Sequence, residues 1–100
     1  MTMQSGSFSL GSSGPSALAV DTSTFYDVFF PTPFPEGSNV IVIPMVQTFN
    51  GPDTPGLRIA NVTTTGFQIR MNELVRGGPR EALSDGGHYA EQIGWIAIAD

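Results

Sequence analysis

The sequence predicts an all-β fold, either a six-stranded β-sandwich or a β-barrel. Apolar and polar residues alternate with a period of two along most of the chain, and turn-forming residues separate six such segments. No segment shows the i, i+3, i+4 apolar spacing over three turns that an amphipathic helix needs. One hundred residues suit one small domain, so we expect residues 1–100 to form a single unit.

The first two predicted strands are short and lie on either side of a loop. Phe8 and Leu10 share one face of the segment "SGSFSLG", and serines occupy its other face. A loop rich in Ser, Gly and Thr follows, and "FYDVFF" (25–30) then predicts an aromatic strand. The segment "PTPFPEGS" (31–38) is predicted to be a loop because its three prolines cannot donate to a sheet.

The segment "NVIVIPMVQTFN" (39–50) predicts the third strand. It is β-branched and apolar on both faces, which is typical of a central strand that is covered on both sides. Pro44 opposes that position, because its missing N–H demands a sheet edge, a bulge or a strand switch.

The second half of the chain predicts a hairpin, a long loop and a final strand. After the turn "GPDTPG", residues 57–62 and 67–72 are predicted to pair around "TTTG". Residues 76–87 are predicted to be a polar loop, and the last strand to run from about Tyr89 to Ala99. In the second hairpin strand, one face is predicted to carry Phe67, Ile69 and Met71, and the other Gln68, Arg70 and Asn72.

The composition favours self-association. Charged residues make up 13% of the chain and hydrophobic residues 40%, whereas about a quarter of the residues in an average soluble domain are charged. The missing charge predicts surface that is buried against another copy of the chain. The alternative is a β-protein whose surface is solvated by neutral Ser, Thr and Asn side chains.

Charge and motif content exclude several classes of function. The net charge is −5, there is no lysine, and there are four Lys+Arg residues in all, so no basic stripe could bind nucleic acid or an anionic membrane surface. No apolar run approaches the ~20 residues of a membrane helix. The N-terminus lacks the basic and apolar regions of a signal peptide, so we expect cytoplasmic synthesis and, for any extracellular role, release in a virion or by lysis.

The sequence predicts a protein that is not an enzyme and needs no cofactor. There is no cysteine, and His88 is the single histidine available as a base. No serine lies in a G-x-S-x-G motif, and no pair of carboxylates occupies matching strand positions. Asp85, His88 and Glu91 fall at three-residue spacing, which we interpret as solvated loop residues rather than a metal site.

Several segments taken in order resemble the H-type lectin domain. They are "QSGSFSLG", the aromatic strand, "NVIVIPMVQTFN", the "LRIANVTTTGFQIRM" hairpin and the terminal "GWIAIAD", which together span nearly the whole chain. The resemblance implies a six-stranded antiparallel β-sandwich that assembles as a homotrimer. It also implies binding of galactose or N-acetylgalactosamine in clefts between subunits.

The resemblance assigns a ligand-binding role to four residues. Arg58 follows the leucine that opens the fourth strand and would bond the sugar, and Tyr89, six residues before Trp95, would line the site. Asp21, in the loop before the second strand, would supply the acidic group. His88 is a candidate to replace aromatic residues that the family carries after the hairpin.

The chain departs from the family at two places. Leu74 and Val75 stand where the animal lectins have an aromatic pair, so the sugar specificity is open. Leu10 and Met71 stand where secreted members have a disulfide, and an apolar pair there suits a reducing compartment.

Two hypotheses follow. The first is a carbohydrate-binding protein for galactose-type sugars or a bacterial surface glycan, and the second is a trimeric tip or adaptor of a phage tail or fibre with a degenerate sugar site. Arg58 has two corresponding interpretations: it binds a sugar hydroxyl beside an acid, or it forms an ion pair with Asp21 or Asp53.

Overall fold

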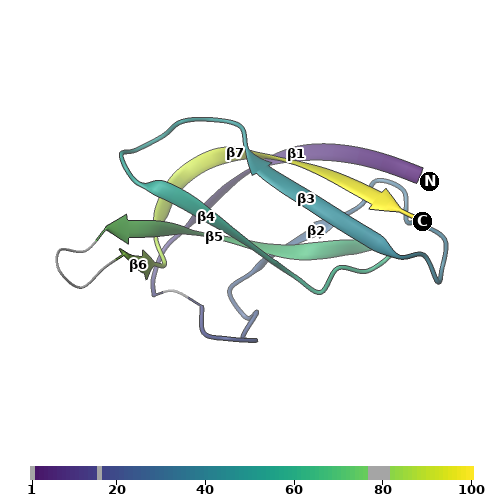
Figure 1. Cartoon of the computed structure of the whole chain (residues 1–100), viewed down its shortest axis with the longest axis horizontal. Helices are drawn as coiled ribbons and strands as arrows, with labels where there is room; N and C mark the ends of the chain where they lie inside the picture. The colour runs from purple at the N-terminus through teal and green to yellow at the C-terminus, as the bar shows by residue number, and fades with distance from the viewer. Residues whose placement is uncertain (1, 16, 77–81) are drawn as a thin grey trace.

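The protein is built from two antiparallel sheets that pack face to face (Figure 1). The structure, a computed structural model, describes residues 2–15, 17–76 and 82–100, with only the backbone for 73–76 and 82–85. One sheet has the order β1-β7-β3; the other has the order β2-β5-β4, and β6 also pairs with β5. The strands are β1 (Thr2–Ser12), β2 (Tyr26–Phe29), β3 (Val40–Val46), β4 (Thr54–Ala60), β5 (Gly66–Arg76), β6 (Ala82–Asp85) and β7 (His88–Ala99).

The all-β prediction is confirmed, and each of the six predicted strands is found. Among the described residues there is no helix, and hence none long and apolar enough to cross a membrane. The predicted loop 76–87 is wrong in part, because Ala82–Asp85 forms a seventh strand. It exists because β5 continues past Asn72 to Arg76 and offers that extra length as an edge for pairing.

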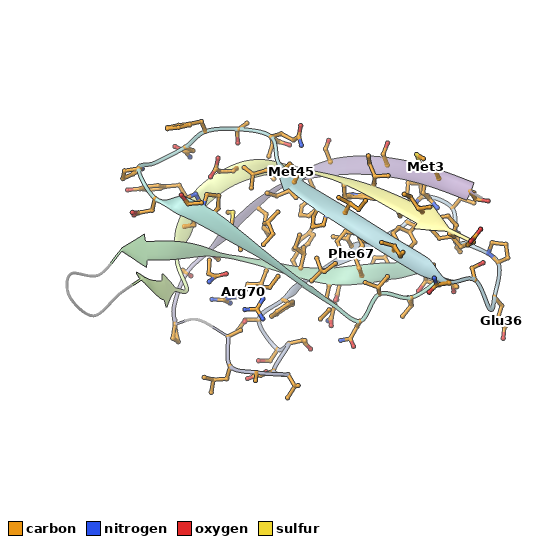
Figure 2. The ribbon with its side chains drawn as sticks, in the orientation of Figure 1. Met3, Glu36, Met45, Phe67 and Arg70 are labelled. Atoms are coloured by element: carbon orange, nitrogen blue, oxygen red, sulfur yellow. The ribbon has the colours of Figure 1, made fainter. Side chains whose placement is uncertain are left out.

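The core lies between the two sheets and follows the predicted alternation. From β7, Ile93 and Trp95 point inward, and from β5 Phe67 and Ile69 do so (Figure 2 shows Phe67 between the layers). The rings of Phe67 and Trp95 meet edge to face, with centroids 5.8 Å apart, an arrangement that adds to the hydrophobic gain of burial. Leu10 and Met71 are both buried in this same cluster.

The third strand does not have the central position that its sequence predicted. Among the described strands, β3 pairs only with β7 and forms an edge of its sheet, which is one of the positions that Pro44 demanded. Val42 is buried, but Ile41, Ile43 and Met45 on the other face are exposed in the single chain (Met45 in Figure 2). Packing within one chain therefore explains why the inner face of β3 is apolar. It does not explain why the outer face is apolar as well.

Two residues of the N-terminal "QSG" segment fix the position of β1, one by hydrogen bonds and one by close packing. The side-chain amide of Gln4 donates to the Thr32 carbonyl oxygen at 2.6 Å and accepts the Thr32 N–H at 3.3 Å, as a neighbouring strand would. Two residues on, a Cβ at Gly6 would lie 2.6 Å from Cζ2 of the Trp95 indole. Glycine is therefore required at this position so that the indole can pack this closely against β1.

We predict that Gly6→Ala lowers the free energy of unfolding by about 1–3 kcal/mol, because the new methyl group must displace the buried Trp95 ring. Ser7→Ala, one residue along and exposed, is the control and should change that free energy by less than about 0.5 kcal/mol. Urea denaturation followed by tryptophan fluorescence measures both. Equal stability of the two variants would contradict the role given to Gly6.

Candidate functional site

The candidate site begins with a gap along one side of β5. β2 pairs with the first part of β5 as far as Tyr26 opposite Ile69, and β6 pairs with its last part from Asp85 opposite Glu73. Arg70 follows directly after the end of the β2 pairing. The segments that flank this gap are the loop between β1 and β2, which Figure 1 shows lying beside β5, and the turn between β6 and β7.

The guanidinium of Arg70 joins these segments. Its Nη1 donates to Thr24 Oγ1 at 2.6 Å, and its Nη2 donates to the carbonyl oxygens of Pro15 at 2.8 Å, Gly86 at 3.1 Å and Ser13 at 3.3 Å. Figure 2 shows Arg70 projecting from β5 toward the loop. The residue is only 5% exposed. One side chain on β5 thus holds the loop against the sheet.

Close backbone packing reinforces this contact. A Cβ at Gly86 would overlap the backbone of Gly14 and Pro15, so the turn before β7 can touch the loop only because it has no side chain there. The glycine therefore allows the carbonyl oxygens of Pro15 and Gly86 to reach the same guanidinium nitrogen.

The loop and the β4–β5 hairpin enclose a cavity of about 370 Å³. This volume is within the range of small-molecule sites. The polar and aromatic residues that line it are Asp21, Thr22, Phe25, Arg58, Arg70 and Asn72. Two residues that the resemblance assigned from distant parts of the sequence, Asp21 and Arg58, are therefore brought to one cavity.

The two arginines of the cavity lie directly opposite each other in the sheet. Arg58 on β4 is the register partner of Arg70 on β5, and like charges in such a pair repel. Arg70 is bonded only to neutral oxygens. Among the described side chains no carboxylate forms an ion pair with either arginine, and this includes Asp21 and Asp53, the two acids proposed for Arg58.

Asp21 is held at the cavity by its own turn. Its Oδ1 accepts the backbone N–H of Ser23 at 3.0 Å, and its N–H donates to the Leu18 carbonyl oxygen. Hydrogen bonding from Ser23, by its backbone N–H first and by its side chain second, lowers the pKa of the Asp21 carboxyl below its usual value, because it favours the ionised form. Val20 beside it is fully exposed and has a left-handed backbone, φ 58°, which is strained for a β-branched residue.

His88 is placed away from this cavity, in a buried pair. Its Nε2 lies 2.5 Å from Glu91 Oε2, and both side chains are essentially inaccessible to solvent. The β1–β7 register shifts between Leu10 and Ser12, so β7 holds one extra residue there. This bulge turns His88 to the same side as Glu91, although residues three apart on a regular strand face opposite sides. A side chain so enclosed is not available to a ligand.

Tyr89 is exposed but also does not line the cavity. It is 64% exposed, and its ring packs against Gly51 and lies edge to face with His88, centroids 6.4 Å apart. The structure describes only the backbone of Leu74, Val75 and Asp85, so the predictions that concern their side chains lie outside the described part. Among those that are described, no three His, Asp or Glu residues gather in a way that could hold a metal ion.

Arg70 is the residue that sequence reasoning missed. The sequence predicted that Arg70 lies on the face of β5 that does not carry Phe67 and Met71. It did not predict that the β1–β2 loop covers this face and buries Arg70. The sequence signal that could have identified Arg70 was the predicted hairpin, since pairing residues 57–62 with 67–72 brings Arg58 and Arg70 within one residue of each other.

Comparison with protein-family models, with curated proteins and with solved structures found no match.

We predict that Arg70→Met lowers the free energy of unfolding by about 2–4 kcal/mol, because three carbonyl oxygens and a hydroxyl lose their donor in a buried site. Arg58→Met, at the opposite position on β4 but exposed, should change it by less than about 0.5 kcal/mol. Chemical denaturation of the matched pair measures this difference. Equal losses would show that Arg70 does not hold the loop.

Proposed function

We propose that the chain is a carbohydrate-binding protein that binds sugar at the cavity of Arg58 and Asp21 and acts as a homotrimer. The observation that carries this proposal is the meeting of Arg58 and Asp21 at one cavity. A guanidinium and a carboxylate that line the same cavity can donate to and accept from hydroxyl groups of one ligand, and charge-assisted bonds of this kind are the stronger ones. Phe25, half-buried at the same cavity, adds an aromatic surface.

The proposed self-association uses the outer face of the β1-β7-β3 sheet. This apolar outer face consists of exposed side chains from all three strands, namely Met3, Ile41, Ile43, Met45 and Ile96. Met3 and Ile41 both lie opposite Ile98, and Ile43 lies opposite Ile96, so the side chains form rows across the sheet. Exposed apolar surface of this kind marks an interaction site, and the low charge of the chain fits coverage by further copies.

An intersubunit site accommodates the position of Tyr89. Within one chain Tyr89 does not reach the cavity, but it is exposed and so is available to a neighbouring subunit. In the family that the sequence resembles, sugars bind between subunits. The cavity lies on the outer face of the β2-β5-β4 sheet, because Arg58 and Arg70 point away from the core. Completion of the cavity by Tyr89 of another copy is thus proposed to use a second contact between copies, besides the apolar outer face.

The alternative is a trimeric tip or adaptor of a phage tail or fibre whose sugar site is degenerate. The observation that favours it is the burial of His88 against Glu91, which removes the proposed replacement for the family's aromatic pair. In this case the apolar outer face still assembles the trimer, but the cavity has no ligand. The test of sugar binding separates the two functions.

We predict that the native assembly binds glycans on an array and that Arg58→Ala lowers the binding at least about tenfold, because one charge-assisted bond is worth about 1.5 kcal/mol or more. The variant should unfold at the same denaturant concentration as the wild type, since Arg58 is exposed. Asn39→Asp, which is exposed and outside the cavity, is the control. An array without signal, or full binding by Arg58→Ala, would contradict the proposed site.

We predict a solution mass of three times the 10.6 kDa of one chain, measured by light scattering after size exclusion. Ile43→Glu should give a folded monomer, because it places a charge in the middle of the apolar outer face. Phe29→Glu is the matched control, since Phe29 is exposed on the other sheet. A wild-type monomer, or a trimer that survives Ile43→Glu, would refute the proposed assembly.

A further inference from the structure

The charges at the cavity are unbalanced. Arg58 and Arg70 line it with Asp21, which leaves a net single positive charge in a chain whose net charge is −5. Arg70 is fixed and nearly buried, and its Nε has no hydrogen-bond partner among the described residues. A buried cation without an acidic partner is unfavourable, so its charge favours an anion in the adjoining space.

Arg58 is placed to bind such an anion directly. Its side chain is exposed, lines the cavity, and forms no ion pair with a described residue. A guanidinium presents parallel N–H groups that match the two oxygens of a carboxylate. Arg70 acts from the floor of the cavity through its charge, because its Nη groups are already bonded to the loop and to Gly86.

The remaining polar groups suit the rest of a sugar. Asp21 accepts the Ser23 N–H through Oδ1, and a carboxylate has about four lone-pair sites, so it can also accept from a hydroxyl. Thr22 lines the same space. A ligand that matches both the arginines and the Asp21 and Thr22 side chains carries one anionic group and several hydroxyls.

We propose that the sugar bound here is a carboxylate-bearing one, a hexuronic acid residue of an acidic glycan. This inference rests on the proposed carbohydrate-binding function and names its ligand class. A single carboxylate matches the single net positive charge, whereas a phosphate monoester carries about −1.5 to −2 at neutral pH and would meet Asp21 with excess charge.

The test is a ¹⁵N-NMR titration of the native assembly with three sugars that differ only at C6: galacturonate, its uncharged methyl ester, and galactose. We expect galacturonate to bind at least about tenfold more tightly than either neutral sugar. Its shifts should centre on Asp21, Thr22 and Arg58. Raising the salt should reduce the difference, since Arg58 is exposed.

Each other outcome overturns a defined part of the account. Galactose or the ester binding as tightly as galacturonate refutes the acidic ligand and leaves the lectin function standing. Galactose 6-sulfate is titrated as a fourth sugar. If it binds more tightly than galacturonate, the assignment of a carboxylate as the anionic group of the ligand is refuted. No shift with any sugar of this set or of the glycan array refutes both the inference and the proposed function.

A matched pair of variants ties the preference to the cavity. Arg58→Gln should bring galacturonate within about threefold of galactose, because it removes the direct partner of the carboxylate. Asn39→Asp makes the same change in net charge outside the cavity and should leave the preference intact. A preference that survives Arg58→Gln, or that falls equally in both variants, contradicts the proposed contact.

Discussion

The buried guanidinium of Arg70 is the interaction on which the candidate site depends. It collects a hydroxyl and three carbonyl oxygens from the β1–β2 loop and the β6–β7 turn. A loop on the surface of a sheet has few apolar contacts of its own, so a single multidentate donor can decide where it lies. Because that loop carries Asp21 and forms one wall of the cavity, we expect the loss of the Arg70 bonds to disrupt the site.

The strands were largely predictable from local pattern, whereas the site was predictable only in part. Alternation along residues 67–71 and 93–99 identifies inward side chains such as Phe67 and Trp95, because the period of a strand is local. Pro44 indicated an edge position for β3, whereas the apolar residues on both faces of the strand indicated a central one. The two indications conflict because sequence alone does not distinguish residues of a core from residues of an interface. The pairing of His88 with Glu91 depends on a bulge, which alternation alone does not reveal.

The resemblance and the geometry contribute different parts of the functional proposal. The resemblance selects Arg58 and Asp21 from separate segments, and their meeting at one cavity supports a ligand there. It does not select Arg70, whose charge changes the expected ligand from a neutral to an acidic sugar. The apolar outer face and the Tyr89 ring are both exposed in a single chain, which leaves them available to the proposed trimer.

The most direct measurement is the hydrogen exchange of the arginine guanidinium protons, followed by NMR at low temperature on the unliganded protein. If Arg70 is buried and bonded as described, its Nη protons should exchange at least about tenfold more slowly than those of Arg58, its exposed partner across the hairpin. Equal and rapid exchange at the two arginines would mean that the loop is not held, and the cavity would lose its physical basis.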